Sequence, residues 1–545
     1  MNIKLFSSKF INLKNLYGRQ LLIILIPFSI YLFNTSFLSD WIIDDAGITY
    51  AYAKNLAHGY GLVSQPGVSP VEGYSNFLWL LLMVPFFWIN IFHPYITVKA
   101  ISFICVLLTY IYLHFSIKHI TNKILPSFIV LIYLSLNTSY LVWTCSGLEN
   151  PLLGLIGVIL LFHLLKIPTG KCTNTKNSIK IGLIVSIIGL TRPDGIMYSL
   201  VFPTYLLYLF LFSKLKYKNI LCSFISYIST VILLIGAFIV FRYLYFGQFY
   251  PNTYYVKGGP TISKIIKSLL LQDTYLTKMQ VLVSSLFGNY FWLITILTII
   301  LSATILIIKK VKRDNIVILL IITYISLLTH ILMPNDWMGE FRFATLFIIY
   351  YYCILIILIT LIIDLLIHKF RYKAVITVLI FTILLGGISE EYYSRFRKFI
   401  DAPVVAFEGV KRYYSDRFDN YSDKLNLTSA SILLPDIGAT LFYSKLKVYD
   451  LVGLTDPVIA KILKRDKKRF YDYVFKEIKP TFIHIHGNWT FQSNFDSDPR
   501  FRMDYVPISE YKDTWIKDKT NKDMMSGDFI RKDVIIGKED ILENL

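Results

Sequence analysis

Residues Asp40–Gly61, DWIIDDAGITYAYAKNLAHGYG, directly follow the first apolar run of the chain, at about residues 21–38. Asp44 and Asp45 stand side by side just after that run, and apolar side chains recur after them at helical spacing. The spacing predicts an amphipathic helix that lies on the membrane surface. The two acids allow two interpretations. Either one of them caps this helix, or a carboxylate at the water–lipid boundary takes a proton from an incoming hydroxyl or helps to hold a divalent cation.

The composition indicates an integral membrane protein. The 545 residues are 55% hydrophobic and have a mean hydropathy of +0.55, whereas soluble domains are less apolar. The net charge is +19, and the bases cluster in short loops between apolar runs, as in cytoplasmic loops of membrane proteins. This distribution argues against nucleic acid as a partner. The five cysteines show no metal-ligand spacing.

The basic loops predict the topology. Cytoplasmic positions are expected for the N-terminus and for residues 213–219, 309–315 and 368–373. The chain would then be external at a first loop, residues 39–74, at a large loop, residues 242–288, and in its C-terminal region. An inside N-terminus and an outside C-terminus require an odd number of crossings, so we expect about eleven spans from twelve apolar stretches.

The sequence changes character near residue 388. Residues 1–388 form the predicted multi-span module, and residues 389–545 carry only short apolar runs: SILLP from Ser431, KVYDLVGL from Lys447 and TFIHIHG from Thr481. These runs predict buried strands, and about 150 residues suffice for a separate core. We therefore expect a small extracytoplasmic α/β domain. His484 and His486 share one strand face and would form half of a metal site.

Several charged residues flank or interrupt the apolar runs. Glu149 precedes an apolar helix, where an acid complements the helix dipole. Arg192 and Asp194 interrupt an apolar segment, where ionisable residues pair with each other or serve a function. Lys257 and Arg342 fall in external loops. Such cations either reach out to lipid headgroups or bind a lipid-linked phosphate through charge-assisted hydrogen bonds.

The order of these motifs resembles a known superfamily. The motifs are DDAGITYAYAKNLAHGYGLV, VEGYSNFLW, SGLENP, TRPDG, YPNTYYVK, NDWMGEFRF and DIGATLFYSKLKVYDLVGLTDP. Together, over residues 20–460, they resemble the GT-C glycosyltransferases, which use polyprenyl-phosphate sugars. The nearest resemblance is to the terminal β-(1→2)-arabinofuranosyltransferases of actinobacterial cell walls and their bacterial relatives. The resemblance implies a catalytic acid in the first external loop, at Asp44 or Asp45.

The hypothesis is an inverting transferase that moves a sugar from polyprenyl phosphate to an envelope glycan, lipid or protein. Asp45 or Asp44 would be the general base, while Arg342, Lys257 and Arg192 would steady the departing phosphate. Glu72 would position a sugar hydroxyl. The other expected substrate contacts are Tyr74, Asn76, Glu149, Asn252, Tyr254 and Asp336. Displacement without a covalent intermediate predicts inversion at the anomeric carbon.

Two alternatives remain open from the sequence. A divalent cation, Mg²⁺ or Mn²⁺, would have Asp44 and Asp45 as ligands, although no cofactor is certain. A transporter or flippase of a lipid-linked sugar would also place charges in and near spans. For a transferase as for a transporter, we expect a multi-pass protein of the bacterial inner membrane. Such a protein contacts membrane lipids and has its C-terminal domain outside the cytoplasm.

Overall fold

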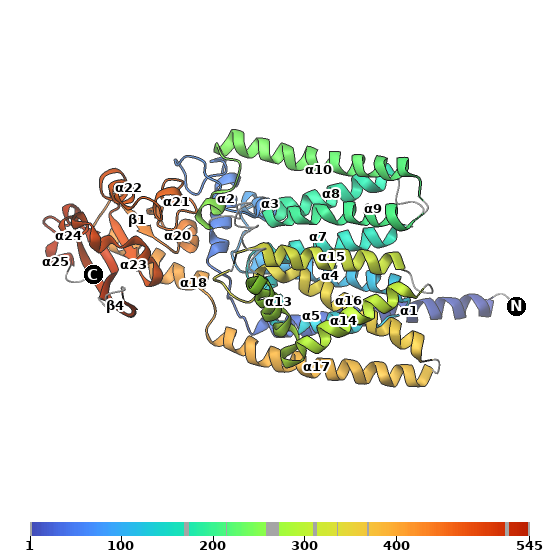
Figure 1. The fold of residues 1–545 in the computed structure, drawn as a ribbon. Helices are drawn as coiled ribbons and strands as arrows, with labels where there is room; N and C mark the ends of the chain where they lie inside the picture. Colours follow the sequence, from blue (N-terminus) through green and yellow to red (C-terminus); the bar gives the residue numbers. More distant parts are fainter. Residues whose placement is uncertain are drawn as a thin grey trace. The chain divides into compact units, whose positions relative to one another are not determined.

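The structure is a computed structural model. It describes residues 3–167, 174–213, 215–257, 272–308, 313–334, 336–367, 370–517 and 523–542. The chain folds into two compact units, each built from separated segments (Figure 1). The first unit contains Met1–Asp40, Tyr95–Phe238 and Pro260–Val404, and the second contains Trp41–Pro94, Ile239–Gly259 and Val405–Leu545. The expected division at residue 388 stays a prediction.

The first unit is helical. Its helices are α1 (Ile3–Ser36), α4 (Ile96–Thr121), α5 (Leu125–Ser135), α6 (Thr138–Cys145), α7 (Asn150–Lys166), α8 (Thr175–Thr191), α9 (Val201–Phe212), most of α10 (Tyr217–Phe246), α13 (Gln272–Phe287), α14 (Phe291–Ile307), α15 (Arg313–Leu332), α16 (Thr345–Leu366) and α17 (Phe370–Asp401). Helix α16 is buried around almost its whole circumference and packs against α5, α7, α14 and α15. It is apolar on every side, as a central helix must be.

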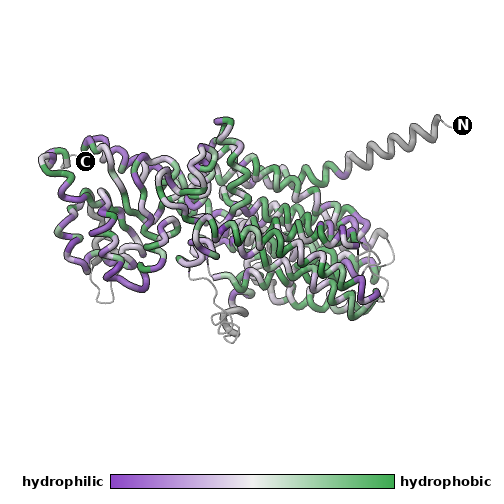
Figure 2. Tube along the Cα trace, turned by 90° about the horizontal axis from the view of Figure 1, so that it is seen from above, coloured by the Kyte–Doolittle hydropathy of each residue, from purple (hydrophilic) through white to green (hydrophobic). Residues whose placement is uncertain are grey.

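The long helices confirm a membrane protein. Among the described residues, six helices are long and apolar enough to cross a bilayer, and two further bent helix pairs raise the number to eight if each pair is one span. Figure 2 shows the long helices mostly in green, the colour of hydrophobic residues. Only helices satisfy all their backbone groups within one segment in lipid. The expected eleven spans stay a prediction, and residues 258–271 of the expected large external loop lie outside the described part.

The second unit contains a mixed sheet surrounded by short helices. Its strands are β1 (Ser431–Leu434), β2 (Lys447–Asp450), β3 (Phe482–Ile485), β4 (Tyr505–Lys517) and β5 (Asp523–Arg531), in the order β2-β1-β3-β5-β4. Strand β1 runs parallel to β2 and β3, and β5 runs antiparallel to β3 and β4. The three expected strands are confirmed as β1, β2 and β3.

The helices of the second unit come from all three of its segments. They are α2 (Asp45–Ala57), α3 (Phe77–Trp88), α11 (Asn252–Lys257), α18 (Phe407–Val410), α19 (Asp416–Lys424), α20 (Gly438–Tyr443), α21 (Ile459–Ile462), α22 (Lys467–Asp472), α23 (Gly487–Ser493), α24 (Pro499–Asp504) and α25 (Glu539–Leu542). One face of the sheet carries an aromatic core that includes Phe470, Phe495, Phe501 and Phe529. Such a core lets this part of the chain bury its own apolar surface.

Most of the predicted first external loop belongs to this second unit. Ile43 forms an antiparallel bridge with Ala406, and α2 packs against α20. The expectation that α2 lies on the membrane surface is wrong, because Ala46–Ala53 are all buried in protein. The close approach needs glycine on both sides. A Cβ on Gly47 would lie 2.4 Å from the carbonyl carbon of Gly438.

Candidate active site

Asp44 is anchored by the N-terminus of α20. Its Oδ2 accepts a hydrogen bond from the Gly438 N–H and its Oδ1 accepts one from the Ala439 N–H, both at 2.8 Å. The side chain is buried, with 5% exposure. Burial raises the pKa of the Asp44 carboxyl, as does the negative charge of Asp436, while the two N–H donors oppose the shift. Asp44 makes no capping bond to its own helix α2 and instead caps α20, so the capping interpretation is wrong for Asp44.

Asp45 has a different environment. It is the first residue of α2 and is half-buried, whereas its neighbour is buried. The two adjacent acids are therefore not equivalent. One is fixed by backbone donors, and the other keeps partial access to solvent.

Glu72 forms a buried ion pair with Arg242. The Arg242 guanidinium contacts both carboxylate oxygens, with Nη2 3.1 Å from Oε1, and the Glu72 side chain is 3% exposed. The Glu72 carbonyl also accepts the Asn252 N–H at 2.9 Å. Arg242 was absent from the predicted site, although a base at the end of an apolar run is a signal that an acid partner exists.

Two polar atoms near this ion pair are buried without a partner. Among the described residues, neither the Tyr74 hydroxyl nor the Asn252 Oδ1 has a hydrogen-bond partner. The Asn252 amide nitrogen, by contrast, donates to the carbonyls of Gly453 and Leu454. A buried polar atom usually has a protein, water or ligand partner. These two atoms therefore suit a bound hydroxyl group.

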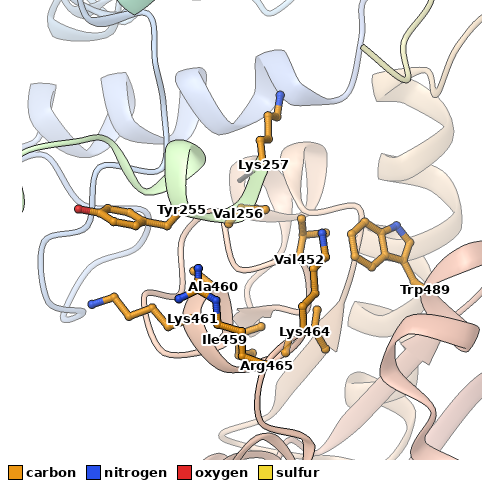
Figure 3. A pocket seen from close by; sticks show the side chains of 11 residues that line it. Tyr255, Val256, Lys257, Val452, Ile459, Ala460, Lys461, Lys464, Arg465 and Trp489 are labelled. Carbon is orange, nitrogen blue, oxygen red and sulfur yellow. The ribbon is translucent and has the colours of Figure 1, made fainter. Parts of the chain in front are cut away.

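The remaining predicted contacts of the second unit are engaged in other ways. The Asn76 Oδ1 accepts from the Thr49 hydroxyl at 3.1 Å and is buried. Tyr254 stacks on Tyr250 with ring centroids 4.5 Å apart. Lys257 is exposed and lines a cavity of about 150 Å³ (Figure 3). A larger cavity of about 540 Å³ beside α2 is lined by none of the predicted residues.

The first unit contains a second charged cluster, centred on Glu149. Its Oε1 accepts from Arg192 Nη1 at 2.5 Å and from Arg342 Nη2 at 3.2 Å, and Glu149 is fully buried. Arg192 Nε also donates to Asp194 at 2.9 Å, which confirms the ion pair considered from the sequence. Asp336 lies 4.0 Å from Arg342 Nη1. Four predicted site residues, Glu149, Arg192, Asp336 and Arg342, thus lie together, and Asp194 belongs to the same cluster.

This cluster is not simply cationic. Its two arginines face three carboxylates. Most of the guanidinium donors are used within the cluster, but the Arg342 Nε is buried and has no hydrogen-bond partner among the described residues. That nitrogen is the donor that an incoming anion would find.

His484 and His486 hydrogen-bond to each other. His484 Nδ1 lies 2.6 Å from an Asp528 oxygen, His484 Nε2 lies 2.9 Å from His486 Nδ1, and His486 Nε2 lies 3.2 Å from Asp436. Although burial opposes it, the contacts of His484 and Arg417 hold the pKa of Asp528 below its usual range. The two imidazoles thus connect Asp528 to Asp436.

The described residues show no ligand set for a metal ion. Both Asp44 oxygens already accept N–H groups. Across the described ranges, no group of three or more His, Cys, Asp or Glu side chains is placed to hold a metal ion. The Mg²⁺ or Mn²⁺ alternative stays a prediction.

Comparison with known proteins identifies the fold. Residues 420–527 match a family described as a domain of unknown function, DUF8728. No curated protein matches the chain. Among solved structures, the Archaeoglobus fulgidus oligosaccharyltransferase in complex with Zn and sulfate has a TM-score of 0.56 and 12% identity, over 93% of this chain and 73% of that chain. ArnT from Cupriavidus metallidurans, bound to undecaprenyl phosphate, has a TM-score of 0.52 and 9% identity, over 94% and 98%.

The chain has the GT-C fold. A third similar structure is the Archaeoglobus fulgidus oligosaccharyltransferase AglB with an inhibitory peptide and a dolichol-phosphate, at a TM-score of 0.53 and 9% identity over 93% of this chain and 74% of that chain. At such identities the likeness is one of fold. The fold expected from the motif order is thereby confirmed, and the arabinofuranosyltransferase subtype stays a prediction.

Proposed function

We propose that this protein is an inverting glycosyltransferase that moves a sugar from a polyprenyl-phosphate donor to an acceptor on the outer face of the bacterial inner membrane. The observation that carries the proposal is the acid pair at the start of α2, one member anchored and the other half-exposed, in a chain with the GT-C fold. Similar structures hold a dolichol-phosphate or undecaprenyl phosphate, which supports a lipid-linked donor. The acceptor class is an envelope glycan, lipid or protein.

Asp45 is the general base in this proposal. A base must reach the acceptor hydroxyl, and Asp45 keeps the access that its buried neighbour lacks. Asp45 takes the hydroxyl proton while the oxygen attacks the anomeric carbon and the lipid phosphate leaves from the opposite face, so the configuration inverts. Asp44 is a positioning residue, because its bonds to Gly438 and Ala439 fix the first turn of α2.

The contacts proposed for the donor rest on buried polar atoms that have no hydrogen-bond partner among the described residues. Arg342 and Arg192 keep their predicted role at the departing phosphate, which the unpartnered Arg342 Nε beside Glu149 supports within the first unit. The Tyr74 hydroxyl and the Asn252 Oδ1 are assigned to sugar hydroxyls, since both are buried without a partner among the described residues. The predicted roles of the other residues stay predictions: Glu72, Asn76, Glu149, Tyr254, Lys257 and Asp336.

The test is transfer in liposomes by the purified protein. A panel of radiolabelled polyprenyl-phosphate sugars is presented with a crude envelope acceptor, and wild type is compared with Asp45→Asn. We expect label in the acceptor with wild type and a loss of at least 100-fold in the variant, in line with removal of a general base. Asp40→Asn is the matched control, because Asp40 is an exposed acid of the same loop.

Two outcomes would contradict the proposal. If Asp45→Asn transfers label as fast as wild type, the base is elsewhere. If label crosses the bilayer still attached to its lipid and never reaches the acceptor, the protein is a flippase of a lipid-linked sugar.

A further inference from the structure

A cavity in the second unit is surrounded by positive charge. Its volume is about 150 Å³, below the roughly 300–1,000 Å³ of sites for drug-sized ligands. It therefore suits a single small polar residue of a larger ligand. Lys257 lies on its rim, and α21 with the following residues contributes Lys461, Lys464 and Arg465 (Figure 3). No acidic residue lines it.

Lys464 and Arg465 differ from three arginines of the same domain. Arg469, Arg500 and Arg531 each pair with a carboxylate. Within the described part of the chain, Lys464 and Arg465 have no ion pair. Two neighbouring cations without counter-charge repel each other, and a bound anion would relieve that repulsion.

The cavity also has aromatic walls. The half-buried Trp489 stands on one side and Tyr255 on the other (Figure 3). The Lys461 ammonium lies over the Tyr255 ring, 5.9 Å from its centroid, which fixes that ring by a cation–π contact. An exposed indole face offers apolar surface to the C–H face of a sugar ring. Cations beside an aromatic wall therefore suit a ligand with both a charge and a ring.

We infer that this cavity binds one anionic sugar residue, a sugar carrying phosphate or carboxylate, through Lys464 and Arg465 at the charge and Trp489 at the ring. A phosphorylated or acidic glycan and a glycolipid headgroup both present this chemistry. The inference concerns binding and does not depend on the proposed transfer reaction. Lys257 has a predicted role at the donor phosphate and is left unchanged in the test.

The test uses the full chain in phosphatidylcholine nanodiscs and measures binding of radiolabelled glucose 6-phosphate by equilibrium dialysis. Glucose and inorganic phosphate are separate probes. We expect glucose 6-phosphate to bind more tightly than glucose or inorganic phosphate. Added salt should weaken the binding of glucose 6-phosphate. The double variant Lys464→Ala with Arg465→Ala should bind glucose 6-phosphate at least tenfold more weakly than wild type. Trp489→Ala should reduce its affinity to that of inorganic phosphate while leaving phosphate binding unchanged.

Lys468→Ala is the matched control, because Lys468 is an exposed base of the same segment that does not line the cavity. The inference is overturned if the control weakens binding as much as the double variant, or if inorganic phosphate binds as tightly as glucose 6-phosphate. A second arm adds phosphatidylglycerol vesicles. Retention of the protein by these vesicles without binding of glucose 6-phosphate would also overturn it, since the cavity would then recognise lipid charge alone.

Discussion

Replacing Asp44 by Asn tests whether the two acids have separate roles. The wild-type carboxylate accepts one backbone N–H on each oxygen, both at 2.8 Å. Asn keeps one carbonyl oxygen and turns an NH₂ group towards the other N–H. One charge-assisted bond is lost and a buried donor is left unpaired, which costs about 1.5–3 kcal/mol.

The expected readout is amide exchange at the start of α20. At 1.4 kcal/mol for each factor of ten, the Gly438 and Ala439 amides should exchange about 10- to 100-fold faster in Asp44→Asn. Hydrogen–deuterium exchange with mass spectrometry on peptides covering residues 436–443 measures this. Asp45→Asn is the control, which should abolish transfer and leave this exchange unchanged.

The reasoning fails if Asp44→Asn leaves exchange at α20 as slow as in wild type. The carboxylate would then not hold these amides, and the ground for choosing Asp45 as the base would disappear. It also fails if Asp45→Asn accelerates the same amides equally, because the two acids would then share one structural role.

Three further predictions concern the second unit. Glu72→Ala should destabilise the second unit by about 3–5 kcal/mol, since Arg242 is left buried and unpaired. The double variant Glu72→Leu with Arg242→Met should lose less stability, because no charge is left unpaired. Thermal unfolding in detergent measures the stability of both variants. Gly438→Ala should reduce the folded yield on size-exclusion chromatography, because its Cβ would lie 1.8 Å from a first-loop carbonyl, while Gly409→Ala, with nothing within 4 Å, should not. Burial raises the pKa of Asp450 to about 7, so its contribution to stability is fully present below about pH 4 and is lost as the pH rises through 7. Amide-exchange protection of residues 447–455 should therefore fall from pH 5 to pH 8 after correction for intrinsic exchange. Asp450→Asn should remove this pH dependence.

The sequence was sufficient for features that have a local signature. Apolar runs predicted the long helices, and short apolar runs between polar turns predicted β1, β2 and β3. Strands β4 and β5 were missed because charged and polar residues interrupt their apolar ones, as in YVPISEYKDTWIK of β4, which also contains a proline. The pairing of Arg192 with Asp194 was foreseeable because the two residues are two positions apart.

The partners of Asp44 could not be predicted in this way. Its hydrogen-bond donors are backbone N–H groups that follow it by 394 and 395 residues. Every residue except proline carries such a donor, so no side chain marks the partner. Glu149 is similar, since it joins two arginines 43 and 193 residues away. Gly47 and Gly438 mark the place where the two backbones approach closely, but a glycine does not identify its partner.

The C-terminal region is better understood as part of the candidate active site than as a separate appendage. The first loop contributes the acids, the end of α10 contributes Arg242, α11 contributes Asn252, and the sheet domain contributes the amides that hold Asp44. Contacts between such distant segments carry a large loop-closure cost, which only the complete set of contacts repays. The acid pair therefore reaches its final geometry only after residues 438 and 439 have folded.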